Sequence, residues 1–182
     1  MNFCDKDIIE IFLNENQIRE KVVELAKRIS SDYKNRQPTF ISILKGSVVF
    51  LSDLLRNLDI HCLVDFVAIS SYGGETESSG VVRQLLDLRE NPVGKDLIVV
   101  DDIVDTGLTL SYLRNNLMTR HPASLKICVL LDKKKKRKID VPIDYTGFVI
   151  PDRYVVGYGL DYQEKYRNLP YVGVLNPEVY KK

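Results

Sequence analysis

The chain has 182 residues, of which 45% are apolar, and its 26 Lys and Arg residues nearly balance its 25 Asp and Glu residues, giving a formal net charge of +1. This length predicts one domain with a sizeable buried core. The balanced charge argues against a protein built mainly to bind nucleic acid or an anionic membrane surface.

The first half of the chain alternates helical and strand patterns. Residues 15–34 repeat apolar side chains at helical spacing beneath a charged face, which predicts an amphipathic helix. Its expected buried face consists of Ile18, Val22, Leu25, Ala26 and Ile29. We expect a short strand at 39–46, a buried helix at 48–58, and a strand rich in Val, Ile and Phe at 62–70.

The middle of the chain is interrupted by a polar segment. Residues 71–80, SYGGETESSG, contain three glycines and almost nothing apolar, which predicts a mobile surface loop. Strands are expected at 81–88 and 95–103, on either side of the turn ENPVG. A helix is expected to open at Leu108, and residues 124–132 form a nearly continuous apolar strand.

Strands that are apolar on both faces and alternate with helices predict an α/β fold with a mainly parallel sheet covered on both sides. From residue 144 onward the chain holds short strand patterns and many aromatic side chains. We expect this tail, with some N-terminal residues, to cap the sheet. The expected organisation is one domain, with a core at about residues 36–150 and a hood formed by the N-terminal residues and about 151–182.

Targeting, membrane and disulfide signals are weak in this sequence. No run approaches the ~18 apolar residues of a membrane span, and the acidic, interrupted N-terminus is not typical of a signal peptide. The three cysteines, Cys4, Cys62 and Cys128, are far apart and belong to no metal-binding spacing. We therefore expect free thiols in a reducing compartment and a cytoplasmic protein, with no membrane association.

The stretch VVDDIVDTGLTL, residues 99–110, collects three aspartates between an apolar strand and a helix. Ligands of open α/β sheets bind at the carboxyl ends of the strands. The segment DTGLT, residues 105–109, combines N–H groups at a helix N-terminus with two hydroxyls, which favours a phosphate. Asp101 and Asp102 can accept hydrogen bonds from sugar hydroxyls or hold Mg²⁺. The stretch therefore predicts a sugar-phosphate site, although Asp105 taken alone would also fit a helix cap.

This stretch resembles the 5-phosphoribosyl-1-pyrophosphate (PRPP) motif of the type I phosphoribosyltransferases, in which four apolar residues precede two acids and an Asp-Thr/Ser-Gly-x-Thr loop. Relatives usually carry Glu-Asp where this chain has Asp101 and Asp102, a departure that keeps both carboxylates. Four more segments are similar to the hypoxanthine-guanine members of the family, namely ILKGS at 43–47, SSYGGETESSG at 70–80, LLDKK at 130–134 and the C-terminal segment at 150–175. The resemblance implies the type I phosphoribosyltransferase fold, a twisted, mainly parallel sheet flanked by helices with a small hood.

The resemblance also implies a purine salvage reaction, in which PRPP and hypoxanthine or guanine give IMP or GMP and pyrophosphate. Asp105 would be the general base or acceptor for the purine N7 proton. The 5′-phosphate would be bound by Thr106, Gly107, Leu108 and Thr109. Asp101 and Asp102 would hold the ribose hydroxyls, directly or through Mg²⁺. Asp161 would hold Mg²⁺ or face the base.

Further residues would bind the leaving group and the base. The pyrophosphate would meet Leu44, Lys45 and Gly46, where the family can carry a cis peptide, together with Arg167. Ser71 and Tyr72 would begin a lid over residues 71–80 that excludes water. A 6-oxopurine would be bound by Lys133, which donates to its oxo group, by the ring of Tyr154, and by backbone groups of Val155.

Several alternatives remain open on the sequence alone. Lys133 begins the run KKKKRK, residues 133–138, and only its spacing to Tyr154 and Asp161 selects it, so a shift of one residue remains open. Such a run is also typical of a solvated loop or a nucleic-acid contact. The alternatives are a phosphoribosyltransferase for xanthine or a pyrimidine, and a related RNA- or DNA-binding regulator. The family commonly forms homodimers or homotetramers, and the apolar surface near Lys45 is the interface that the resemblance suggests.

Overall fold

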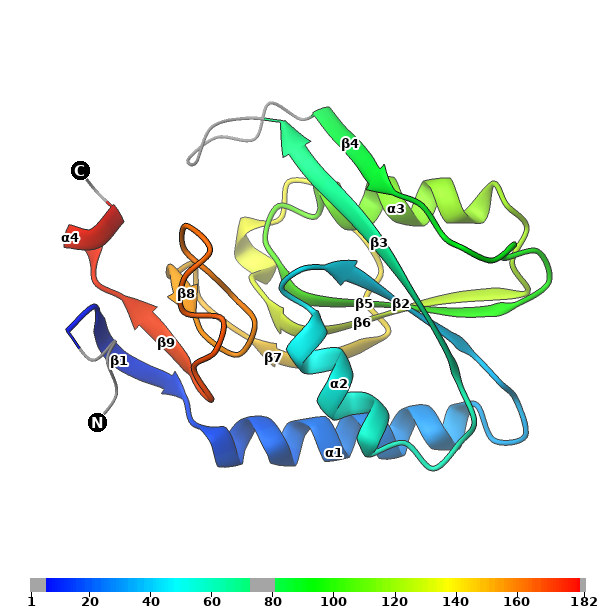
Figure 1. The fold of residues 1–182 in the computed structure, drawn as a ribbon, viewed down its shortest axis with the longest axis horizontal. Coiled ribbons are helices and arrows are strands. Elements are labelled where there is room, and N and C mark those ends of the chain that lie inside the picture. Colours follow the sequence, from blue (N-terminus) through cyan, green and yellow to red (C-terminus); the bar gives the residue numbers. More distant parts are fainter. Residues whose placement is uncertain (1–5, 73–80, 181–182) are drawn as a thin grey trace.

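The structure, a computed structural model, describes residues 6–72 and 81–180. Within these residues a six-stranded sheet has the order β4-β3-β2-β5-β6-β7, and a three-stranded sheet has the order β1-β9-β8 (Figure 1). The large sheet comprises β2 (Thr39–Leu44), β3 (Leu63–Tyr72), β4 (Val81–Leu86), β5 (Asp96–Val104), β6 (Ser124–Asp132) and β7 (Tyr145–Val149). The small sheet comprises β1 (Ile8–Leu13), β8 (Val155–Val156) and β9 (Val172–Leu175). The helices are α1 (Glu15–Asp32), α2 (Val48–Arg56), α3 (Leu108–Met118), α4 (Pro177–Tyr180) and the short 3-10 helix η1 (Lys134–Lys136).

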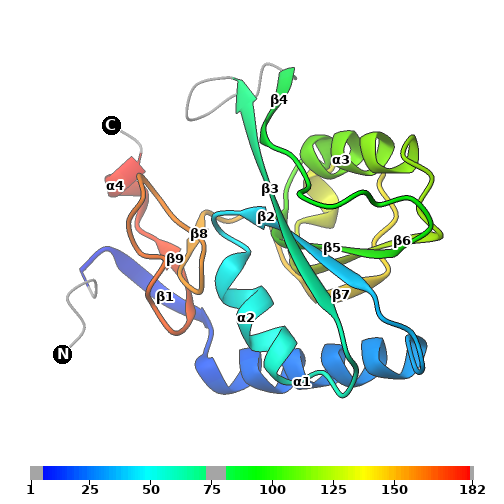
Figure 2. The same ribbon diagram turned by 45° about the vertical axis from the view of Figure 1, so that its right-hand side comes forward.

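The large sheet is parallel except at one edge. β3, β2, β5, β6 and β7 pair in parallel, whereas β4 pairs antiparallel with β3. Figures 1 and 2 show α1 and α2 on one face of the sheet and α3 on the other. The predicted α/β fold is therefore confirmed, and its apolar strands are explained by burial on both faces.

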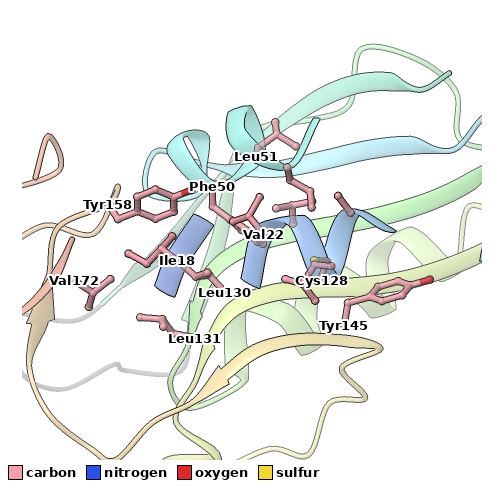
Figure 3. Close-up of a cluster of buried hydrophobic side chains, with 14 of the residues drawn as sticks. Ile18, Val22, Phe50, Leu51, Cys128, Leu130, Leu131, Tyr145, Tyr158 and Val172 are labelled. Carbon is pink, nitrogen blue, oxygen red and sulfur yellow. The ribbon is translucent and has the colours of Figure 1, made fainter. Parts of the chain in front are cut away.

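The predicted first helix forms with the expected buried face. Asn14 caps α1, since its side chain accepts from the Gln17 N–H and the Gln17 side chain accepts from the Asn14 N–H. All five apolar residues predicted for its inner face are buried. Figure 3 shows that Ile18 and Val22 of this face lie in the same cluster as Tyr158 and Val172 from the C-terminal part. Burial of apolar surface thus joins the small sheet to the core of the large one.

We call β1 together with residues 151–180 the hood. The N-terminal strand β1 pairs antiparallel with β9 of the C-terminal segment. The tail from residue 144 is not all cap, however, because β7 pairs with β6 and extends the large sheet. The hydroxyl of Tyr158 donates to Asp53 of α2 at 2.6 Å, which fastens the hood to the core.

Three expectations concern other parts of the chain. Among the described helices, none has both the length and the apolar character to cross a membrane. Cys62 and Cys128 are free thiols, and Cys4 lies outside the described residues. Of the predicted lid at 71–80, Ser71 and Tyr72 belong to β3, and residues 73–80 lie outside the described part of the chain.

Candidate active site

The acidic strand end and the helix that follows it form one side of a cavity. β5 runs to Val104, a short loop crosses Asp105 to Gly107, and α3 begins at Leu108, as predicted. Gly107 has φ of 82°, and a Cβ atom there would press against the carbonyl oxygen of Ile139, so this turn requires glycine. The cavity measures about 200 Å³ and is lined by Ile43, Asp101, Asp102, Ile103, Val104, Asp105, Thr106, Gly107, Thr109 and Leu110.

The N-terminus of α3 is capped by Gly107, which has no side chain to hydrogen-bond the first turn. The interpretation of Asp105 as a simple helix cap is therefore wrong. The N–H of Leu108 makes only a long contact, of 3.4 Å, with the hydroxyl of Thr106. A helix terminus with weakly used N–H groups at the edge of a cavity favours an anion such as a phosphate.

Asp101 and Asp102 lie side by side at the same edge. Asp101 is 8% exposed, and its carboxylate accepts from the Asp102 N–H at 3.1 Å, while that of Asp102 accepts from the Ile103 N–H at 2.8 Å. Burial raises the pKa of both carboxyls, and the neighbouring charge of Asp102 raises the pKa of Asp101 further. Neither carboxylate has an ion-pair partner within residues 6–72 and 81–180. The pair is therefore suited to hydroxyl donors or a cation supplied by a ligand.

The turn after β2 faces this acidic pair. The Leu44–Lys45 peptide is cis, as the resemblance allows. A Cβ atom on Gly46 would overlap a carboxylate oxygen of Asp102, so only glycine lets the turn approach so closely. The Lys45 ammonium lies 3.1 Å from the carboxylate of Glu164 in the hood.

Arg167 and Asp161 bind each other within the hood. One Arg167 nitrogen lies 2.9 Å from Asp161 and 3.2 Å from Glu164, and another donates to the carbonyl oxygen of Gly159 at 2.8 Å. Asp161 also accepts from the backbone N–H of Glu164 at 2.9 Å. These contacts hold the predicted pyrophosphate arginine in a defined position and occupy the Asp161 carboxylate.

The predicted metal set of Asp101, Asp102 and Asp161 is not brought together as one ligand cluster. No group of three or more His, Cys, Asp or Glu side chains suited to a metal ion occurs in the part of the chain that the structure describes. The Asp161 carboxylate is paired with Arg167 instead. The acidic pair of β5 still fits Mg²⁺, which typically takes one or two carboxylates and fills its other positions with water and substrate oxygens.

Lys133 lies next to Asp105. Its backbone N–H donates to the carbonyl oxygen of Val104, and its side chain is only 8% exposed. The ammonium lies 3.2 Å from Asp152 and 3.8 Å from Asp105. Within the basic run, Lys134 and Lys135 are exposed, so the structure brings the residue selected by spacing, and not the next one, to the site.

The aromatic residue predicted to stack on the base lies at the edge of the hood. The Tyr154 ring is 36% exposed, stacks on Tyr180 with centroids 4.7 Å apart, and meets the edge of Tyr162 at 5.7 Å. Val155 is buried in β8, where it pairs with Val174. The structure therefore gives Tyr154 a fixed orientation, while Val155 belongs mainly to the small sheet.

Sequence reasoning missed the partners of the predicted cations. Asp152 contacts Lys133, and Glu164 contacts both Lys45 and Arg167. In the sequence, these two acids differ from other acids only in lying close to Tyr154 or Asp161. Ion pairs between distant segments leave no local sequence pattern that would identify them.

The loop after β6 is held by a further pair that the sequence did not reveal. Arg137 binds Asp132 through two hydrogen bonds, of 3.1 and 2.7 Å, and both side chains are nearly buried. The N–H groups of Lys138 and Ile139 then donate to the carbonyl oxygen of Thr106. This loop is thereby fixed against the loop that precedes α3.

A second, larger hollow lies away from these residues. It measures about 870 Å³ and is lined by the end of α1 and the segments before β2 and β3. It contains none of the predicted site residues, and its size alone does not make it the site.

Comparison with known proteins decides the family. A family model described as the phosphoribosyl transferase domain matches residues 9–163. The chain belongs to the phosphoribosyltransferase family.

Individual members of the phosphoribosyltransferase family match nearly the whole chain. The chain is 47% identical over 178 residues to a hypoxanthine-guanine phosphoribosyltransferase from Lactococcus lactis, covering 98% of this chain and 97% of that protein. A crystal structure of a hypoxanthine phosphoribosyltransferase from Staphylococcus aureus has a TM-score of 0.95 and 44% identity, covering 100% of this chain and 98% of that one. A bifunctional protein TilS/HprT from Listeria monocytogenes is 44% identical over 176 residues, but this chain spans only 27% of its length.

The raised pKa of Asp101 predicts a gain in stability when its charge is removed. In the folded state the pKa of this carboxyl is above its ordinary value of 3.8. The folded state therefore binds more protons than the unfolded state, and the free energy of unfolding falls as the pH rises through the higher pKa. We expect Asp101→Asn, without divalent cations, to raise the free energy of unfolding at neutral pH, because the amide places no charge in this buried position.

Urea unfolding at several pH values measures this effect. The gain should vanish below about pH 4, where the carboxyl is protonated in both states. Asp140→Asn, at a fully exposed position, is the matched control and should change little. A variant no more stable than the wild type at neutral pH would contradict the prediction.

Proposed function

We propose that this protein transfers the 5-phosphoribosyl group of PRPP to hypoxanthine or guanine, giving the nucleotide and pyrophosphate. One observation carries the proposal: the N-terminus of α3, the acidic pair of β5 and Asp105 all line one cavity. The first suits a phosphate, the second suits sugar hydroxyls, and the third suits an N–H donor of a base. The names of the relatives from Lactococcus lactis and Staphylococcus aureus support the same activity.

The acceptor for the base is an oxygen of Asp105. Its Oδ1 atom is buried and has no hydrogen-bond partner among the described residues, whereas Oδ2 faces lysines. A buried oxygen without a donor is costly until a ligand supplies one. The N7 proton of a purine would supply that donor, and Asp105 would then orient the base or take its proton.

The leaving group would be bound between the turn after β2 and the hood. Lys45 and Arg167 share the carboxylate of Glu164. A pyrophosphate carries more charge than one carboxylate and would replace Glu164 as their partner. These cations would stabilise the negative charge that develops as the bond from C1 to pyrophosphate breaks.

Mg²⁺ is the cofactor that this chemistry requires. Asp101 and Asp102 would hold it or the ribose hydroxyls, because neither carboxylate has an ion-pair partner among the described residues. When bound, Mg²⁺ neutralises charge on the pyrophosphate. Asp161 would take part only on release from Arg167.

Selection of a 6-oxopurine would rest on Lys133. An ammonium group can only donate hydrogen bonds. It therefore binds a base with an oxo group at position 6 and disfavours adenine, whose 6-amino group is also a donor. The exposed ring of Tyr154 would stack on the base, and the backbone of Val155 would lie at its edge.

The alternative of a nucleic-acid regulator is weakened by the basic run itself. Lys133 is nearly buried, Lys136 pairs with Asp105 and Asp152, and Arg137 pairs with Asp132. Half of the six cations are therefore paired with carboxylates of the protein, and two of these three are nearly buried, so they are less available to phosphates of RNA or DNA.

Assays of hypoxanthine, guanine, xanthine and uracil side by side, each with PRPP and Mg²⁺, test the proposed function. We expect the first two bases to give nucleotide and pyrophosphate, and uracil to give little product. Uracil lacks the imidazole N–H from which Asp105 would accept a hydrogen bond. Turnover of uracil or xanthine in preference to both would favour the alternative enzymes. Salt-dependent RNA binding without any turnover would favour the regulator.

Asp105→Asn tests the assigned acceptor. We expect folding and PRPP binding to stay nearly intact while the turnover number falls by roughly 10²-fold or more, the effect of a positioned acid–base group. Steady-state kinetics and PRPP titration calorimetry measure the two effects separately. Asp140→Asn, an exposed position in the neighbouring loop, is the control. Unchanged turnover would remove Asp105 from the mechanism.

We also propose that the protein is a cytoplasmic homo-oligomer. Each chain would form a single domain, with a core at about residues 36–150 and a hood from the N-terminal residues and about 151–182. The proposed interface consists of Val48, Val64, Phe66 and Leu86, which are between 36% and 45% exposed. Val64 and Phe66 pair in register with Phe40 and Ser42 and so share the sheet face that α2 covers. This apolar face continues from α2, just after the Lys45 turn, and a second copy would bury it.

Phe66→Glu tests the interface. The wild type should have at least twice the mass of the 20.9 kDa chain in light scattering, and the variant should approach the mass of one chain because a charge would be buried in the contact. Val93→Glu, at an exposed apolar residue in the turn before β5, should stay oligomeric. A wild type that is a monomer, or a variant of unchanged mass, would exclude this interface.

A further inference from the structure

The basic run contains a second lysine at the site, which the proposed function does not use. The Lys136 ammonium lies 3.0 Å from the Oδ2 atom of Asp105 and 3.3 Å from Asp152. Lys133 contacts the same two carboxylates. Two lysines and two aspartates therefore form a closed cluster with balanced charge beside the cavity.

The two oxygens of Asp105 have different environments in this cluster. Oδ2 faces both ammonium groups, and Oδ1 is buried without a partner. A hydrogen bond to Oδ2 fixes the rotation of the carboxylate about its Cβ–Cγ bond. The free oxygen is thereby kept in one direction.

The backbone holds Lys136 in place from both sides. Its N–H donates to the carbonyl oxygen of Lys133 at 2.8 Å, closing the turn of η1. The next residue, Arg137, is anchored on Asp132, and Lys138 donates to Thr106. This position is therefore fixed by the fold, in contrast to a lysine on a free loop.

The charge of Lys136 is also maintained. Burial opposes its ammonium form, but the hydrogen bonds and charges of Asp105 and Asp152 outweigh burial and raise its pKa. Lys134 and Lys135 are exposed like Lys136, but they make no ion pair with any described residue.

We propose that Lys136 is a positioning residue, which holds Oδ2 of Asp105 so that Oδ1 stays turned toward the nucleobase. This inference rests on the proposed function. When Lys133 donates to the oxo group of a purine, it leaves Asp105 and Asp152, and Lys136 is then the cation that keeps both carboxylates paired. The two lysines thus have different roles: Lys133 binds the oxo group of the base, and Lys136 orients the carboxylate that accepts the proton of the base.

The test compares Lys136→Met with Lys134→Met and Lys135→Met, which change the net charge equally. We expect Lys136→Met to lower kcat with hypoxanthine about tenfold, the loss of one charged hydrogen bond, with little change in the KM for PRPP. The two control variants should keep wild-type kcat. Lys136→Arg should recover most of the activity, since a guanidinium can contact both carboxylates.

A second comparison shows whether Lys136 acts through Asp105. In an Asp105→Asn background, Lys136→Met should cause no further loss, because no carboxylate remains to be oriented. Equal losses in both backgrounds, equal losses in the three methionine variants, or no loss in Lys136→Met would each overturn the inference. Absence of nucleotide formation by the wild type would instead overturn the proposed function, so the two failures are distinguishable.

Discussion

The structure depends on the burial of two adjacent carboxylates at the end of β5. Asp101 and Asp102 belong to the last part of β5, after a run of residues that is apolar on both faces, and burial raises the pKa of both. A fold selected only for stability would not place two acids there, because removing charge from water is costly without a partner. The glycines around the pair, Gly46 above all, let the backbone approach where a side chain would collide. The site is thus a place where the chain gives up stability to leave a position for a ligand.

The cations of the site show the opposite arrangement. Lys45 and Arg167 share Glu164, and Lys133 and Lys136 share Asp105 and Asp152. Each cation therefore has a carboxylate partner, which keeps the ligand-free site close to neutral at these points. A substrate with more charge than a single carboxylate can replace these partners.

Much of this arrangement could be predicted because its signals are local. The helical spacing of α1 gave its buried face, the apolar run at 124–132 coincides with β6, and the Thr-Gly pair marked the start of α3 at Leu108. The motif spacing also selected Lys133 from six consecutive basic residues, and the structure brings it to Asp105.

The remaining features depend on contacts between distant segments. The assignment of β7 to the large sheet depends on its pairing with β6, which its short, aromatic sequence does not specify. The engagement of Asp161 by Arg167 and the role of Glu164 as a shared partner arise from the folding of the hood loop, where acids look alike in sequence. Lys136 was hidden because its neighbours have the same charge, and only the turn of η1 distinguishes it.

The hood and the turn after β2 behave as one structural unit although they are far apart in the chain. Gly159, with φ of 99°, packs its Cα against the carbonyl oxygen of Gly46, and Arg167 donates to the carbonyl oxygen of Gly159. Tyr158, one residue earlier, is hydrogen-bonded to Asp53 of α2. The backbone segments that carry Lys45 and Arg167 are therefore in direct contact. The apolar cluster that joins the hood to α1 and α2 adds to this contact and fixes the hood relative to the sheet that carries the acids of β5.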